Sequence, residues 1–179
     1  MKTINQQDQK GKIQTVTGVL DPESLGPTLM HEHILFDLTR PEVASKARSE
    51  NIEEVTIGLE NVWEINRRSI LDYGNQSNQT YSIAMDELNF LRSACENAAI
   101  VDLTNFGIKP DPLGLRHLSQ KTNVPIIQGA GYYVDEYIPD EFKSATVDEL
   151  TEEITNQVRL GCWGTDVRAG IIGEIGIDG

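Results

Sequence analysis

The sequence predicts an α/β fold in which strands and helices alternate around a parallel sheet. Short apolar segments bounded by Gly, Pro, Asp or Asn alternate with longer segments of helical periodicity, as in successive βα units. Residues 99–103 and 170–173 are almost continuously apolar, which is typical of strands covered on both faces. The chain has no fixed short repeat and no Pro/Ser-rich linker. We therefore expect flexible residues 1–13 followed by one folded unit over residues 14–179.

Four segments have the apolar, β-branched character and the flanking turn residues of strands. They are residues 28–34, 99–103, 125–128 and 169–175.

Four further segments have helical periodicity. In residues 54–71 and 82–98 apolar side chains recur every three or four positions. Asp111-Pro112 is a typical helix start because Pro is favoured at the first helical position. Residues 146–160 open with Thr-Val-Asp-Glu, the spacing of a capping box. The polar residues 39–51 are expected to form a loop.

Composition excludes several classes of partner. The 179 residues include 15 Lys+Arg and 28 Asp+Glu, a net charge of −13 that repels nucleic-acid phosphates and anionic lipids. No segment approaches the ~20 apolar residues of a membrane span, and the N-terminus has no apolar signal region. Cys95 and Cys162 are expected to be buried free thiols of a reducing compartment. We therefore expect a cytoplasmic protein without nucleic-acid or membrane partners.

Two of the three histidines lie in His31-Glu32-His33, at the end of the first predicted strand. Side chains at positions i and i+2 of a strand project from the same face about 6–7 Å apart, so both imidazoles can bind one ion. Glu32 points the other way. A pair of histidines with ordinary hydrogen bonds at a strand end is the alternative.

Glu174 ends the apolar run Gly170-Ile-Ile-Gly-Glu174, where an unpaired charge is costly. A carboxylate that bridges two cations would be satisfied there, and the cations could activate a water molecule. A salt bridge or a helix N-terminus would satisfy Glu174 equally well.

Four blocks of sequence, in this order, resemble the phosphotriesterase family, and most strongly the phosphotriesterase-related branch of the amidohydrolase superfamily. The resemblance covers about residue 13 to the last residue. The blocks are Val16-Thr-Gly-Val-Leu-Asp-Pro-Glu-Ser-Leu-Gly-Pro-Thr-Leu-Met-His-Glu-His33, Ile100-Val-Asp-Leu-Thr-Asn-Phe-Gly107, Gly129-Ala-Gly-Tyr-Tyr-Val-Asp135 and Arg168-Ala-Gly-Ile-Ile-Gly-Glu-Ile-Gly176.

The resemblance implies a (β/α)₈ TIM barrel with two divalent metal ions, usually zinc, at the carboxyl ends of its strands. His31 and His33 match ligands of one metal, and Glu174 matches the bridging ligand that takes part in catalysis. Phosphotriesterases proper have a carboxylated lysine at that position, so Glu174 favours a relative that acts on an ester, lactone or amide over a phosphotriesterase proper, and hydrolysis of a phosphoester bond stays an alternative. The implied reaction is hydrolysis of a small molecule by a hydroxide that bridges the metals.

The family pattern also requires two later histidines and an aspartate, and His117, in a predicted helix, matches none of them. A barrel of this kind needs about 250 residues. We therefore expect the first four βα units of a truncated barrel, inactive alone. The alternative is a non-catalytic remnant or interaction module with at most a weak metal site. Substrate identity, the choice of divalent metal and the oligomeric state stay open.

Two further residues are weaker candidates. Tyr133 matches an aromatic wall of the family's substrate pocket, although ordinary packing explains it equally well. Asp102, at the end of the second strand, could support the metal ligands by hydrogen bonding, or it could satisfy a turn.

Overall fold

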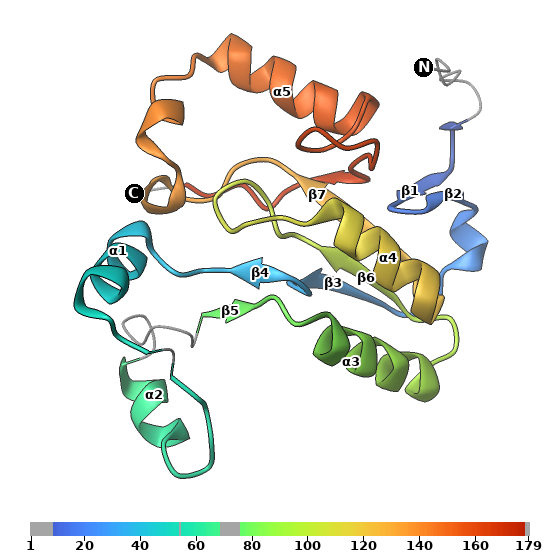
Figure 1. Ribbon diagram of the computed structural model, residues 1–179. Coiled ribbons are helices and arrows are strands. Elements are labelled where there is room, and N and C mark those ends of the chain that lie inside the picture. The colour runs from blue at the N-terminus through green and yellow to red at the C-terminus, as the bar shows by residue number, and fades with distance from the viewer. Residues whose placement is uncertain (1–8, 54, 69–75, 178–179) are drawn as a thin grey trace.

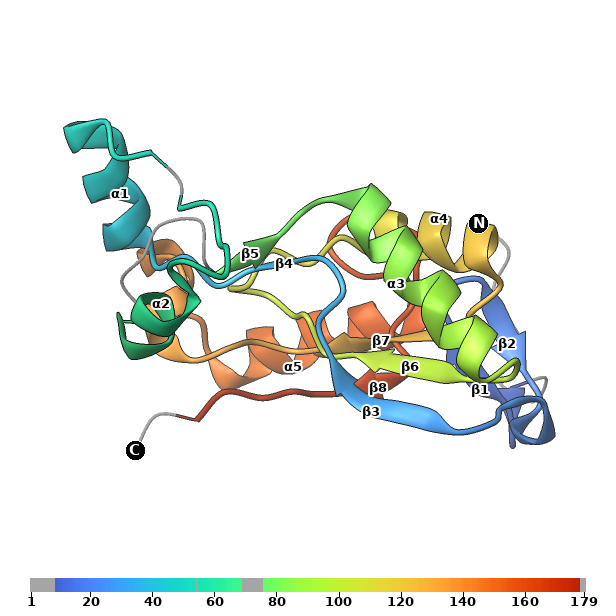
Figure 2. The ribbon, with the colours of Figure 1, turned by 90° about the horizontal axis from the view of Figure 1, so that it is seen from below.

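A four-stranded parallel sheet forms the centre of the computed structural model, which describes residues 9–53, 55–68 and 76–177. The strand order is β3 (Thr28–Glu32), β6 (Ala99–Asp102), β7 (Ile126–Ala130) and β8 (Ile171–Ile172). Figure 1 labels the first three of these strands, and Figure 2 labels β8. All three pairings are parallel. The sheet curls like half of a barrel, which leaves β3 and β8 at its two edges.

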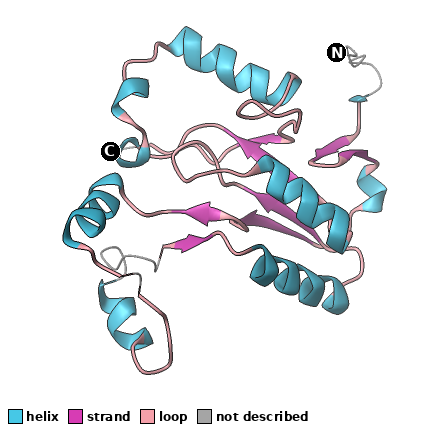
Figure 3. Cartoon of the chain, viewed as in Figure 1, coloured by secondary structure: helices cyan, strands magenta, loops and turns pink. Residues whose placement is uncertain are grey.

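Three helices follow strands of this sheet and cover it. They are α3 (Tyr81–Ala94), α4 (Pro112–Thr122) and α5 (Val147–Arg159). Figure 2 shows α3 and α4 side by side over the same part of the sheet. The alternation of strand and helix confirms the predicted α/β class (Figure 3).

The main core lies between the sheet and helices α3 and α4. Its β6 and β7 members, Ile100 and Ile126, are at most 5% exposed because helices cover this face. The buried members of the cluster are Val16, Ile34, Leu35, Ala84, Leu88, Ile100, Leu115, Leu118, Val124, Ile126 and Val167.

Two predicted helix starts are confirmed by their capping contacts. The Asp111 carboxylate accepts the Gly114 backbone N–H at 2.8 Å, with Pro112 at the first helical position. At the start of α5 the Thr146 hydroxyl accepts the Glu149 backbone N–H, and the Glu149 carboxylate accepts the Thr146 backbone N–H. This is a complete capping box. Helix α3 ends four residues earlier than predicted, at Ala94.

The segment between β3 and α3 differs most from prediction. The expected loop over residues 39–51 contains helix α1 (Pro41–Glu50), which begins with Pro41 and ends at Asn51 in the left-handed conformation. The predicted helix over 54–71 is wrong for residues 55–61 and confirmed over α2 (Val62–Arg68). Residues 54 and 69–71 of that prediction lie outside the described residues.

Several short elements were not predicted from the sequence. They are the hairpin of β1 (Ile13–Thr15) and β2 (Gly18–Leu20), the two-stranded sheet of β4 (Phe36–Asp37) and β5 (Ser77–Asn78), and the 3₁₀ helices η2 (Pro22–Ser24), η3 (Asp135–Tyr137) and η4 (Asp140–Phe142). Residues 1–8 of the segment predicted to be flexible lie outside the described residues. Ile13, the last residue of that segment, belongs to β1.

The last predicted strand is shorter than expected. Only Ile171 and Ile172 pair with β7, and the chain then continues as a non-regular segment through Glu174. Both edges of the sheet expose apolar side chains, with Met30 of β3 61% and Ile172 of β8 60% exposed. No helix among the described residues is long and apolar enough to cross a membrane.

Candidate metal centre

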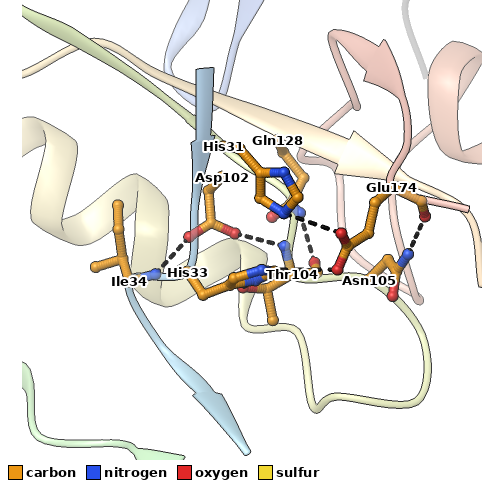
Figure 4. Close-up of polar contacts among 8 residues, drawn as sticks. All are labelled: His31, His33, Ile34, Asp102, Thr104, Asn105, Gln128 and Glu174. Carbon is orange, nitrogen blue, oxygen red and sulfur yellow. Dashed lines mark hydrogen bonds and ion pairs between the residues drawn. The ribbon is translucent and has the colours of Figure 1, made fainter. Parts of the chain in front are cut away.

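Three side chains meet at the carboxyl ends of β3 and β8, as Figure 4 shows. His31 is in β3, His33 follows it directly, and Glu174 lies two residues after β8. Their ligand atoms all lie within 4.8 Å of one another. Strands three places apart in a flat sheet would be separated by about 14 Å, at roughly 4.8 Å per strand. The curl of the sheet is what brings these side chains together.

The Glu174 carboxylate faces both imidazoles with different oxygens. His31 Nε2 lies 2.9 Å from Oε2, and His33 Nε2 lies 3.6 Å from Oε1. The two rings are 5.4 Å apart between centroids, which fits their i and i+2 positions. Two imidazole nitrogens and a carboxylate around one point are a donor set that fits a divalent cation such as zinc. These side chains are therefore the residues that could hold a metal.

Burial and a nearby charge both affect the pKa of His33. Its side chain is 23% exposed, against 56% for His31. Burial lowers the pKa of His33 below 6.5, and the nearby Glu174 carboxylate partly opposes that shift. His33 is therefore mainly neutral near pH 7, the form in which an imidazole binds a metal.

Asp102 is fully buried and lies behind the histidines. Its carboxylate accepts the backbone N–H of Ile34 at 2.8 Å and that of Thr104 at 3.0 Å. Burial raises the pKa of Asp102 to about 6, although these hydrogen bonds favour the ionised form. Asp102 therefore satisfies the turns that follow β3 and β6. No direct hydrogen bond joins it to either histidine among the described contacts.

Three polar residues beside the cluster were missed in the sequence. The Thr104 hydroxyl lies 3.1 Å from His33 Nδ1, and the Asn105 amide donates to the backbone carbonyl of Glu174. Gln128 in β7 donates to the Thr104 carbonyl at 2.9 Å. All three are at most 1% exposed. These residues could have been found in the sequence as polar residues within or directly after apolar strands, because polar side chains buried there need hydrogen-bond partners.

Tyr133 lies near the cluster without a described hydrogen bond to it. Its ring packs edge-on against Tyr137 with centroids 5.1 Å apart. Burial raises the pKa of Tyr133, and the negative charge of Glu174 adds to the shift. His117 is exposed on α4, where its ring lies 6.3 Å from that of Tyr81, and it is not part of the cluster.

The two cysteines differ in how deeply they are buried. Cys162 is buried as predicted, whereas Cys95 is only partly buried, because it follows the last turn of α3 at the surface. Both are free thiols.

Comparison with known proteins places the chain in a family. The sequence profile of the phosphotriesterase family matches residues 11–179. The chain belongs to the phosphotriesterase family. It is 35% identical to the N-acetyltaurine hydrolase of Homo sapiens over 167 residues, and 32% identical to a phosphotriesterase-related protein of Nematostella vectensis over 176 residues. Each match covers 93% of this chain and 48% of the relative, so the chain spans about half the length of these curated relatives.

Solved structures of the family show the same architecture. A resiniferatoxin-binding protein from Rhodobacter sphaeroides superposes with a TM-score of 0.80 at 33% identity, over 93% of this chain and 47% of that protein. The organophosphorus hydrolase from Deinococcus radiodurans gives a TM-score of 0.62 at 26% identity, over 90% and 43%. The curled parallel sheet is therefore half of a TIM barrel, as expected.

Proposed function

We propose that this chain forms the N-terminal half of a metal-dependent hydrolase, in which His31, His33 and Glu174 bind divalent cations. The observation that carries the proposal is the convergence of the three side chains within 4.8 Å, from strands at opposite edges of the sheet. Glu174 lies 143 residues after His31 and 141 after His33 in the sequence, and the packing of the fold does not by itself require these three side chains to meet. The site also lies at the carboxyl ends of the strands, where TIM barrels carry their active sites.

We further propose that the cations are zinc and that Glu174 contacts two of them. Neutral imidazole and carboxylate ligands suit zinc. Glu174 offers two carboxylate oxygens beside the histidine pair, so one oxygen can bind the cation held by His31 and His33 and the other a second cation. Bound divalent cations would supply an activated water molecule and polarise the bond to be cleaved. The chain's own residues hold the ligand positions: Asn105 binds the Glu174 backbone and Thr104 contacts the His33 ring.

The proposed substrate is a small molecule with an amide or ester bond. Similarity to N-acetyltaurine hydrolases favours an amide over a phosphoester, and a lactone is a further candidate. Tyr133 is proposed as an aromatic wall beside the reacting group, because it is half-buried and within the electrostatic reach of Glu174.

A specific observation favours a second candidate, a non-catalytic interaction module with at most a weak metal site. Both sheet edges in the described part of the chain expose apolar side chains, Met30 at one edge and Ile172 at the other. Unpaired apolar edges commonly mark places where another polypeptide binds.

Zinc titration of the metal-depleted 179-residue chain by calorimetry distinguishes the two candidates. We expect His31→Ala and Glu174→Gln to weaken zinc binding by roughly 10-fold or more, since each removes a ligand. His117→Ala is the matched control, because it removes an exposed histidine outside the cluster. Equal zinc binding by all four proteins, or none by any of them, would exclude the proposed site.

Turnover is tested separately with a panel of N-acyl amide, lactone, ester and phosphotriester substrates. The 179-residue chain is expected to be inactive, since the family pattern requires later ligands. A polypeptide that also carries the second half of the barrel should hydrolyse an amide or ester with a dependence on zinc. Zinc-dependent turnover by the 179-residue chain that disappears in His31→Ala would contradict the expected inactivity.

A further inference from the structure

The segment that carries Glu174 has few backbone hydrogen bonds of its own. Strand β8 ends two residues before Glu174. The N–H groups of Gly173 and Gly176 still donate to backbone carbonyls at the end of β7 and just after it, at 2.8 and 3.0 Å. No backbone N–H of the described residues donates to the Glu174 carbonyl itself. That carbonyl accepts the side-chain amide of Asn105 instead.

Asn105 reaches this carbonyl past the end of β7, which lies between β6 and β8 in the sheet. Asn105 is three residues after β6, and Gly131 is the first residue after β7. A Cβ atom at Gly131 would lie 2.5 Å from the Ile175 Cδ1 atom and 3.4 Å from the Glu174 carbonyl oxygen. A side chain at position 131 would therefore crowd the segment to which Asn105 binds.

The Asn105 side chain is 0% exposed and has one polar partner. Its oxygen Oδ1 is buried without a hydrogen-bond partner among the described residues. A buried polar atom without a partner is costly, and an apolar side chain would avoid that cost. The hydrogen bond to Glu174 is therefore what an amide at this position provides to the structure.

The residue before Asn105 contacts the other side of the metal cluster. The Thr104 hydroxyl lies 3.1 Å from His33 Nδ1 (Figure 4). The Thr104 backbone is fixed on both sides, because its N–H donates to the Asp102 carboxylate at 3.0 Å and its carbonyl accepts the Gln128 amide at 2.9 Å. Two consecutive buried residues therefore contact candidate ligands that come from opposite edges of the sheet.

We propose that Asn105 is a positioning residue that fixes the backbone at Glu174, so that the carboxylate faces His31 and His33. Together with Thr104, it sets the spacing between the candidate ligand after β8 and those at the end of β3. The position of Glu174 does not depend on the proposed function. The consequence of that position for cation binding does rest on the proposed function.

NMR of the metal-free 179-residue chain tests the position of Glu174. In the wild type we expect nuclear Overhauser effects between the Asn105 amide protons and the Cα protons of Glu174 and Ile175. We also expect them between the Glu174 side-chain methylene protons and the His31 ring. Asn105→Leu keeps a branched side chain but has no donor, so the contacts between Glu174 and His31 should be lost. Asn105→Ala is the second variant, and it removes the donor without adding bulk.

Zinc calorimetry tests whether Asn105 acts through Glu174. Asn105→Leu should weaken zinc binding by about 10-fold or more, as expected for the loss of a group that orients a metal ligand. In a Glu174→Ala background the same substitution should change the affinity by less than about 3-fold, because the ligand through which it acts is gone. In a His31→Ala background the loss should stay at about 10-fold, since Glu174 is still present.

Ser119→Ala is the matched control. It removes another buried side-chain donor to a backbone carbonyl, that of Val124, and Ser119 lies in α4 outside the metal cluster. The Ser119→Ala chain should keep both the contacts between Glu174 and His31 and the zinc affinity of the wild type.

Three results would overturn the proposal. The first is a wild type without contacts between the Asn105 amide and the Glu174 segment, a measurement that needs no variant to fold. The second is a folded Asn105→Leu or Asn105→Ala chain with unchanged contacts between Glu174 and His31 and unchanged zinc affinity. The third is an equal loss of zinc affinity in the Glu174→Ala background, because Asn105 would then only stabilise the fold. If the wild type binds no zinc, the proposed function fails, while the NMR contacts still decide the role of Asn105.

Discussion

Replacement of Gly129 by alanine should both destabilise the chain and disturb the candidate metal centre. Gly129 lies in β7, where a Cβ atom would come well inside 3.0 Å of the Gly173 backbone carbonyl oxygen, and 3.1 Å from a Leu103 methyl group. Real Cβ atoms essentially never approach other atoms within 3.0 Å. The Gly173 carbonyl would have to move by about 1 Å, because packed interiors hold few voids that could absorb a methyl group.

Two effects follow from a shift of that size. Overpacking typically costs about 1–3 kcal/mol, which corresponds to a fall in Tm of roughly 2–12 °C for a chain of this length. Glu174 follows Gly173 directly, so its carboxylate moves as well. Because metal ligands must stay within about 0.5 Å of their productive positions, zinc binding should weaken by roughly 10-fold or more.

Urea unfolding followed by circular dichroism measures the first effect, and zinc calorimetry measures the second. Gly26→Ala is the control, since its Cβ would come within 2.7 Å of the Asn97 carbonyl oxygen, just before the start of β3. It should lose stability and keep zinc affinity. A Gly129→Ala chain as stable as the wild type would refute the steric argument, and unchanged zinc binding would refute the link from β7 packing to Glu174.

Three other predictions test local features. Thr146→Ala should destabilise the chain by about 1 kcal/mol in urea unfolding, because the Glu149 backbone N–H loses its cap; a change within error would contradict the capping box. Burial raises the pKa of Asp102 to about 6, so its folded form binds a proton more tightly. Asp102 therefore stabilises the fold below about pH 4, and this contribution is lost as the pH rises through 6. In urea unfolding across that range, the Asp102→Asn chain should not show this fall in stability. Burial raises the pKa of Cys162 to about 12, so a thiol reagent should modify partly buried Cys95 first and reach Cys162 only on unfolding; mass spectrometry of the native chain that finds Cys162 modified first would contradict this.

Prediction succeeded where a local physical signal was strong. The starts of α4 and α5 follow from side chains that satisfy exposed N–H groups within one helical turn, at Asp111 and Thr146. Prediction failed over residues 39–51 and 55–61, where helix α1 lies in an expected loop and the described first half of the expected helix does not form. Leu59, in the part that is not helical, is 94% exposed, whereas Ile65, in α2, is 5% exposed. Periodicity predicts a helix only when another element buries its apolar face.

In the candidate site, too, only the contacts between residues close in sequence could be predicted. The pairing of His31 with His33 follows from strand geometry, because positions i and i+2 share a face whatever surrounds them. Thr104 was missed because its only sequence signal is a polar residue after an apolar strand, and its partner lies 71 residues away.

The alternation of strands and helices, the helix caps and the proximity of the two histidines follow from the amino-acid sequence, since each depends on residues within a few positions of one another. That Glu174 faces those histidines, and that Thr104 lies against His33, follows only from the folded arrangement of distant segments. Those contacts depend on how far a parallel sheet curls, which is set by the packing of helices against all four strands together.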